Sequence, residues 1–278
     1  MPDHPQLAGM AIGAARDLLA EARAVCDRDD RVSEANIHRV RVNLKRVRAY
    51  WRLMRFALGR EAEQAGSVRC AQAAGLLSEA RDHVVMLGTL ARLKGKAEVK
   101  SVESIDTAHF DAATKQVVSE DDGPHPAELI DWVRLAGLLD DEQSAWAQLM
   151  DRPIVDDDIR RGLDRTCRKA RRGYKRAKKS PDAQTMHGWR KWVKRLRYQL
   201  ELIGPDSVRV IARLDKLGEC LGQFQDLAVL DRRMRQAEGM DKAHRKRMRK
   251  TIQARQAKLL KKSLKAGKKL FKGKSVAL

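Results

Sequence analysis

The stretch His38-Arg39-Val40-Arg41-Val42-Asn43-Leu44-Lys45-Arg46-Val47-Arg48 recurs 149 positions later as His187-Gly188-Trp189-Arg190-Lys191-Trp192-Val193-Lys194-Arg195-Leu196-Arg197. One histidine, one lysine and three arginines stand at the same offsets in both copies. Composition alone does not readily produce five matched polar positions. The sequence therefore indicates an internal duplication, and both copies should form the same structure.

Each copy separates into two adjacent stripes when it is placed on a helix, which turns by about 100° per residue. One stripe is apolar and should face a core. The other stripe is cationic and borders the apolar one. The apolar stripes consist of Ile37, Val40, Leu44, Val47, Trp51 and Met54 and of Met186, Trp189, Val193, Leu196, Leu200 and Ile203. The cationic stripes consist of His38, Arg41, Lys45, Arg48, Arg52 and Arg55 and of His187, Arg190, Lys194 and Arg197.

Cations three or four residues apart on a helix repel each other, at a cost of about 0.2–0.5 kcal/mol for each pair. An arrangement that occurs twice therefore indicates an anion that offsets the repulsion. An acidic protein surface or a phosphate-bearing ligand would do so, and the planar fork of arginine matches phosphate oxygens. The alternative is a basic face that is merely solvated, and the duplication argues against it.

Length and charge narrow the class of protein. The chain has 278 residues, enough for one large or two modest domains with a real core. A formal net charge of +21 indicates a polyanionic partner, which could be nucleic acid, an anionic membrane surface or polyphosphate. The four cysteines include no CxxC pair, so neither a zinc site nor a redox pair is expected. Without an apolar run of membrane-spanning length, we expect a soluble cytoplasmic protein.

The composition predicts an all-α fold, because helix-forming residues dominate and the few prolines lie mostly between the expected helices. Arg165 and Arg172 follow Arg16 and Arg23 by the same 149 positions, which extends the duplication. Ser33 and the segment 180–182 predict helix starts, and the end of the chain is expected to fray around Gly267 and Gly273. We expect helices at about 7–26, 34–59, 61–94, 127–150, 159–179, 183–203 and 207–237, and a last one from about 241.

An acidic segment separates the two copies. Residues 101–158 contain fifteen Asp or Glu and three Lys or Arg. We expect a surface loop at 121–126 and a helix that closes the first half with its acidic side outward. A second echo, Leu77 to Met86 and Leu221 to Leu230, shares Asp82 and Asp226, which we interpret as ion-pair acceptors for basic helices.

The doubled pattern His-x-x-Arg-x-x-x-Lys-Arg-x-Arg, each copy followed by a Leu-x-x-x-x-Asp segment, resembles the CHAD domain, the conserved histidine α-helical domain. The resemblance covers residues 7–265 and implies two pseudo-symmetric four-helix bundles with a basic channel between them. We therefore expect a single CHAD-like domain over residues 1–278, with half-repeats at about 7–150 and 154–265 and a basic tail at 266–278. The sequence determines neither a preferred chain length of polyphosphate nor the oligomeric state of the protein.

The resemblance also implies a function, the non-enzymatic binding of inorganic polyphosphate and a location on polyphosphate granules. The triphosphate-tunnel domain that often precedes this domain is absent, so no hydrolase is implied. Asn43 and Leu44 depart from the residues that many members carry. By the resemblance, one channel wall would carry His38, Arg41, Lys45, Arg46 and Arg48, and the other His187, Arg190, Lys194, Arg195 and Arg197. Further expected polyphosphate-binding residues are Tyr198, Arg52, Arg165, Arg168 and Arg172.

Other kinds of chemistry find less support. Neither histidine has a second His or Cys at helical ligand spacing, so we expect no metal and no cofactor. Nucleotide-binding, hydrolase and metalloprotease motifs are also absent, which argues against an enzyme. Because the neighbours are cationic, both histidines should be neutral until phosphate raises their pKa, so binding should strengthen as the pH falls from 8 to 6.

Nucleic-acid binding is the main alternative function. Trp51, Trp189, Trp192 and Tyr198 could stack on bases, although Trp51 and Trp189 fall on the apolar stripes. No helix-turn-helix or RNA-binding signature is evident. A scaffold for acidic proteins is a third possibility, in which the segment 101–158 pairs between molecules.

Overall fold

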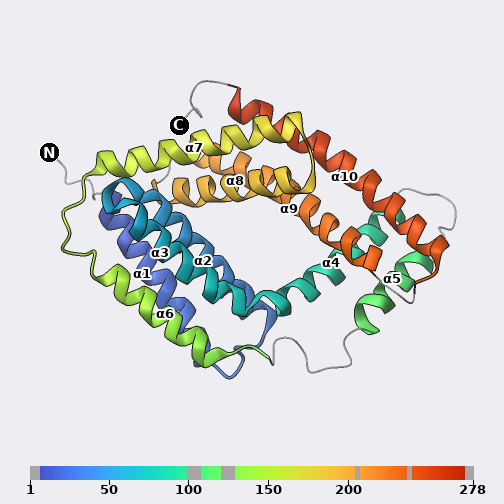
Figure 1. Ribbon diagram of the computed structural model, residues 1–278, viewed down its shortest axis with the longest axis horizontal. Helices are drawn as coiled ribbons and strands as arrows, with labels where there is room; N and C mark the ends of the chain where they lie inside the picture. Colours follow the sequence, from blue (N-terminus) through green and yellow to red (C-terminus); the bar gives the residue numbers. More distant parts are fainter. Residues whose placement is uncertain (1–6, 99–107, 120–128, 204–206, 237–239, 273–278) are drawn as a thin grey trace.

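The computed structural model describes residues 7–98, 108–119, 129–203, 207–236 and 240–272, and within these ranges the chain forms ten α-helices and no strand (Figure 1). The all-α prediction is confirmed. Among the described helices, none combines the length and apolar composition needed to cross a bilayer. The helices are α1 (Leu7–Cys26), α2 (Glu34–Leu53), α3 (Arg55–Leu76), α4 (Ser78–Glu98), α5 (Ala108–Ser119), α6 (Trp132–Ala147), α7 (Asp156–Lys179), α8 (Ala183–Ile203), α9 (Val208–Gln236) and α10 (Lys242–Phe271).

The two repeats begin in the same register. Helices α1 and α7 start 149 positions apart, and so do α2 and α8. The side chain of Ser33 accepts a hydrogen bond from the backbone nitrogen of Asn36 at the start of α2, as the sequence predicts. The backbone nitrogen of Leu7 donates to Asp156 Oδ1 at 2.8 Å, so the first residues of both repeats touch.

The helices contact one another in two groups of four. Helices α1, α2, α3 and α6 pack together, α7, α8, α9 and α10 pack together, and α2 packs against α8 between the groups. The predicted apolar stripes are buried in this core, from Ile37 on α2 to Met54 just after it and from Met186 to Leu200 on α8. The side chain of Ile203, the last predicted member, lies outside the described part. The grouping is compatible with two bundles, while the pseudo-twofold relation between them stays a prediction.

The predicted helix at 61–94 is wrong, because the chain breaks at Leu77 between α3 and α4. Helix α4 leaves the first group and packs against α9 and α5, and α5 packs against α10 (Figure 1). The matching segment of the second repeat, Leu221 to Leu230, stays inside the continuous helix α9. Helix α5 was not expected from the sequence. Gly59, where a stop was predicted, has a φ of 88° and marks a corner inside α3, after α2 has ended at Leu53.

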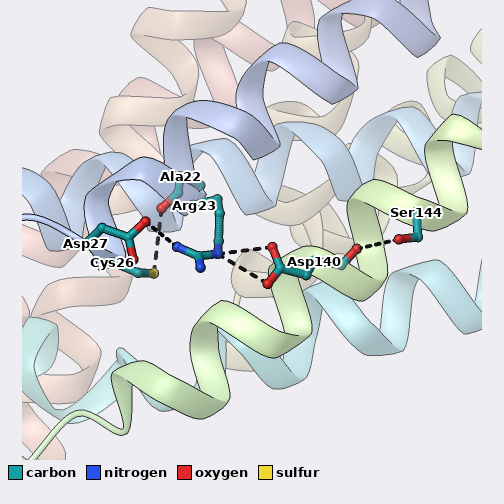
Figure 2. A network of polar contacts seen from close by, with 6 residues as sticks. All are labelled: Ala22, Arg23, Cys26, Asp27, Asp140 and Ser144. Carbon is teal, nitrogen blue, oxygen red and sulfur yellow. Dashed lines mark hydrogen bonds and ion pairs between the residues drawn. The ribbon is translucent and has the colours of Figure 1, made fainter.

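The acidic helix α6 faces partly inward, contrary to the prediction. Arg23 of α1 forms ion pairs with Asp27 at 2.6 Å and with Asp140 of α6 at 3.0 Å (Figure 2). Glu142 is only 1% exposed. Its carboxylate accepts hydrogen bonds from Trp51 Nε1, from Trp146 Nε1 at 3.1 Å and from Arg69 Nε at 2.7 Å. These donors are what keeps the carboxylate inside the bundle, because a buried charge must be paired.

The last helix also extends further than expected. Helix α10 continues to Phe271, so the predicted fraying at Gly267 is wrong. Gly267 is buried at a close approach, since an added Cβ would lie 2.7 Å from both Trp189 Cζ2 and Tyr174 Cδ2. The tail beyond Lys272 and the predicted loop at 121–126 lie outside the described residues.

Candidate functional site

A cavity of about 480 Å³ lies between α2 and α8, and α4 and α9 complete its lining. Its volume falls within the range of about 300–1,000 Å³ that is typical of ligand pockets. Both copies of the repeated motif contribute to it, so residues far apart in the sequence meet here. The lining consists of His38, Arg41, Lys45, Arg48, Val85, Met86, His187, Arg190, Lys191, Lys194, Arg195, Tyr198, Gln225, Asp226 and Val229.

Among the side chains that the structure describes, the lining carries seven Lys or Arg and one carboxylate, that of Asp226. Asp226 Oδ2 lies 3.7 Å from Arg92 Nη2, so part of its charge is directed to a cation outside the lining. Among these described side chains, positive charge is thus in clear excess. The cavity therefore has a strong positive potential, which a low-dielectric wall intensifies.

The two repeats hold their matched arginines differently. Arg41 Nη1 donates to the carbonyl oxygen of Ala74 at 2.9 Å and to Ser78 Oγ at 3.2 Å. In the second copy Arg190 lies against Gly222, where an added Cβ would be 3.3 Å from Nη2. Gly222 follows Leu221 as Ser78 follows Leu77, so matched positions of the second echo support matched arginines. Hydrogen bonds therefore hold Arg41 at the cavity wall, whereas Arg190 packs closely against α9.

Burial and mutual repulsion lower the pKa of several lining groups. The pKa of Lys194 falls to about 8, first because of burial and then because of Arg190 and Arg197. Burial, followed by the charges of Lys191 and Arg190, lowers the pKa of His187. Burial likewise lowers the pKa of Arg190 and Arg195. The pKa falls in all four of these groups of the second copy, which agrees with a wall where buried cations lie close together.

Of the residues expected in the channel, nine line this cavity: His38, Arg41, Lys45, Arg48, His187, Arg190, Lys194, Arg195 and Tyr198. The other six do not line the cavity, and most of them contact other side chains of the protein. Arg46 pairs with Glu201 at 3.3 Å, and Arg197 pairs with Asp215 at 2.5 Å. Arg52 pairs with Glu63 at 2.8 Å, and Arg165 lies over the ring of Trp192. Arg168 and Arg172 are on the exposed face of α7.

Several lining residues were not predicted from the sequence. Lys191 has no cationic counterpart in the first copy, where Val42 stands, so the repeat does not identify it. Its signal was its position four residues after His187, on the same flank of the helix. The apolar contributors Val85, Met86 and Val229 come from α4 and α9 and carry no sequence signal of a site. Asp226 was interpreted as an ion-pair acceptor, and its contact with Arg92 agrees, whereas the Asp82 side chain lies outside the described part.

Comparison with known proteins gives the family. The CHAD domain family matches residues 10–235, so this chain belongs to the CHAD domain family. Its fold is similar to the crystal structure of the CHAD domain from the plant Ricinus communis, with a TM-score of 0.62 and 19% sequence identity. That alignment covers 98% of this chain and 92% of the plant chain. No curated protein matches the chain. CHAD domains are associated with polyphosphate binding in general.

Proposed function

We propose that the protein binds inorganic polyphosphate in the cavity between α2 and α8 and catalyses no reaction on it. The observation that supports this most directly is the lining, whose described side chains include seven cations from two repeats and one carboxylate. A polymer with a negative charge on every unit would meet cations on both walls. The proposal includes a location on polyphosphate granules, where such a domain would find its ligand.

The contacts would be charge-assisted hydrogen bonds to the non-bridging phosphate oxygens. Arg41, Arg48 and Arg190 offer planar forks that can bind two oxygens at once, while Lys45 and Lys194 offer point charges. Each contact would release condensed counterions, so the affinity should fall steeply as the salt concentration rises. Bound phosphate would also relieve the repulsion among the buried cations, which couples binding to stability.

Nucleic acid is supported less well than polyphosphate. Sequence-tolerant binding of single strands uses exposed aromatic rings on which bases stack. Trp51, Trp189 and Tyr198 are at most 3% exposed, so their rings are buried. Trp192 is covered by guanidinium groups instead of open to a base. The cavity thus offers cations and hardly any stacking surface.

A competition experiment tests the choice of ligand. Labelled long-chain polyphosphate is bound to the protein and displaced with unlabelled polyphosphate, RNA, duplex DNA or heparin at one ionic strength. We expect unlabelled polyphosphate to compete best at equal phosphate or charge concentration. A preference for RNA or DNA would overturn the proposal in favour of nucleic-acid binding.

A set of variants tests the site. The triple variant Lys45→Gln, Arg48→Gln and Lys194→Gln removes cations from both walls. We expect polyphosphate affinity to fall by at least about a hundredfold, because each hydrogen bond to a charged group contributes about 1.5–3 kcal/mol. The matched control removes three exposed cations of α7, with Lys175→Gln, Arg176→Gln and Lys179→Gln. Equal losses in both triple variants would mean that net charge, and not the cavity, holds the polymer.

A further inference from the structure

The contact between α2 and α8 is neutralised at one end and cationic at the other. Arg46 of α2 forms an ion pair with Glu201 of α8 at 3.3 Å. The position that matches Glu201 in the first copy holds Arg52, and the position that matches Arg46 in the second copy holds Arg195. The mirrored contact therefore brings two arginines together where its counterpart has an ion pair.

These two arginines share an aromatic ring with a third. The guanidinium carbon of Arg195 lies 4.5 Å from the ring centroid of Trp192, that of Arg52 lies 5.8 Å away, and that of Arg165 lies 5.9 Å away. The three side chains come from α8, α2 and α7. Each gains some attraction to the ring face, but the ring carries no net charge that could offset their mutual repulsion.

The nearby carboxylate does not neutralise this group. Both oxygens of the buried Glu63 side chain are engaged, one with Arg52 at 2.8 Å and the other with Arg55 at 2.6 Å. No carboxylate of the described residues forms an ion pair with Arg165 or Arg195. Four arginines thus stand against one glutamate.

Buried donor atoms without a partner mark the same place. Within the described part of the chain, Arg165 Nη1 and Arg52 Nε are buried and make no hydrogen bond. Such atoms are costly to leave unsatisfied, so a hydrogen-bond acceptor that entered this place would be stabilised. Burial and the neighbouring charges also lower the pKa of Arg52, Arg165 and Arg195, which agrees with a missing anion.

We infer that Arg52, Arg165 and Arg195, arranged around Trp192, form a second site for a phosphate group beside the cavity. The inference rests on the proposed function, since Arg195 lines both places and joins them. The occupant is a tetrahedral phosphate oxyanion, either a unit of the polymer that continues out of the cavity or a separate phosphate ion. If the occupant is the polymer, it leaves the cavity on the Trp192 side, because Glu201 neutralises the opposite end of the contact.

Polyphosphates of different length distinguish binding at this second site from binding in the cavity. Wild type, Arg165→Gln and the control Arg176→Gln are titrated with tripolyphosphate and with long-chain polyphosphate. Both variants remove one cation from α7, but Arg176 is exposed and lies outside the Trp192 group. If the site holds a continuing chain, R165Q weakens the long polymer about tenfold, R176Q weakens it much less, and tripolyphosphate is unaffected by either. Arg165→Lys keeps the charge without the fork, so it should fall between wild type and R165Q.

Fluorescence distinguishes the two sources of phosphate. The emission of Trp192 is obtained as the difference between wild type and Trp192→Phe while orthophosphate is added. A saturable change that R165Q abolishes assigns the site to a separate phosphate ion. A change with long-chain polyphosphate alone assigns it to the polymer. No response of Trp192 to either ligand, together with equal effects of R165Q and R176Q on the long polymer, would overturn the inference.

The two proposals can fail separately. If wild type does not bind long-chain polyphosphate but Trp192 still responds to orthophosphate in an Arg165-dependent way, then the proposed function fails and the second phosphate site stands. If wild type binds the polymer and the cavity triple variant does not, while R165Q equals R176Q and Trp192 is silent, then only the second site fails. Thermal unfolding of each variant checks that the fold is intact.

Discussion

The side-chain amide of Gln199 donates a hydrogen bond of 2.8 Å to the backbone carbonyl oxygen of Ala49, and both residues are fully buried. This contact joins α8 directly to α2, the two helices that form opposite walls of the cavity. The walls are therefore held by a specific polar contact in addition to apolar packing.

Replacement of Gln199 by Leu should loosen this contact. We expect the free energy of unfolding to fall by about 1–3 kcal/mol, because a buried hydrogen bond is lost. Urea unfolding measures the change. The control Gln184→Leu alters an exposed position of the same helix and should stay within about 0.5 kcal/mol of wild type. Equal stability of Q199L and wild type would show that the hydrogen bond does not contribute.

Two glycines on helices should respond oppositely to alanine. A Cβ on Gly162 of α7 would lie 1.9 Å from the carbonyl oxygen of Leu53, whereas a Cβ on Gly137 of α6 meets nothing within 4 Å. We expect Gly162→Ala to destabilise the protein by about 1–3 kcal/mol, because α7 must move away from α2. Gly137→Ala should stabilise it by about 0.4–1 kcal/mol. Changes of the same sign in chemical denaturation would contradict this account of the helix contact.

The buried carboxylate of Glu142 should be indispensable to the first group of helices. Glu142→Ala leaves Arg69 and two indole nitrogens without their acceptor, so we expect a loss of about 3–5 kcal/mol. Asp141→Ala changes the exposed neighbour and should have little effect. Calorimetric unfolding of both variants compares them. A small loss in E142A would mean that water replaces the carboxylate.

Lys194 should make the stability depend on pH. Its pKa in the folded protein is about 8, below the ordinary value of 10.5, so the unfolded chain binds more protons between these values. The contribution of Lys194 to the free energy of unfolding therefore rises as the pH increases from about 8 to about 10.5. Lys194→Met should be more stable than wild type below pH 8, and the difference should shrink above it. A constant difference across this range would refute the assignment.

His187 should make polyphosphate binding depend on pH below about 8. Burial and the charges of Lys191 and Arg190 lower its pKa in the free protein. A bound phosphate would favour the protonated ring, so affinity should strengthen as the pH falls from about 8 to about 6. Isothermal titration at several pH values, with His187→Gln as the non-titrating variant, measures this. His244→Gln, on α10, is the control and should keep the wild-type slope.

The features predicted best from the sequence are those that depend on residues close together in the chain. The amphipathic stripes and the caps at Ser33 and Asp182 depend on neighbours in the chain, and they place α2 and α8 in register. The break at Leu77 has no comparable local signal, because it is the packing of α4 against α9 that turns the chain there. Helix α5 likewise gains its support from contacts with α4 and α10.

The repeated motif predicted those residues of the site that occupy matched positions in both copies. Matched positions led to Arg41 and Arg190, which line the cavity. Arg46 and Arg197 belong to the same motif, but their partners Glu201 and Asp215 become neighbours only once the helices have packed. A periodic pattern shows which side of a helix a residue occupies, and it does not show which carboxylate will meet it.

Helices α4 and α5 lie in the first half of the sequence, but they pack against helices of the second repeat. Helix α4 contacts α9, and α5 contacts α10. The halves are consequently interlocked. If they were severed between residues 151 and 155, each fragment would keep an uncovered apolar face, and we expect refolding only when both are mixed.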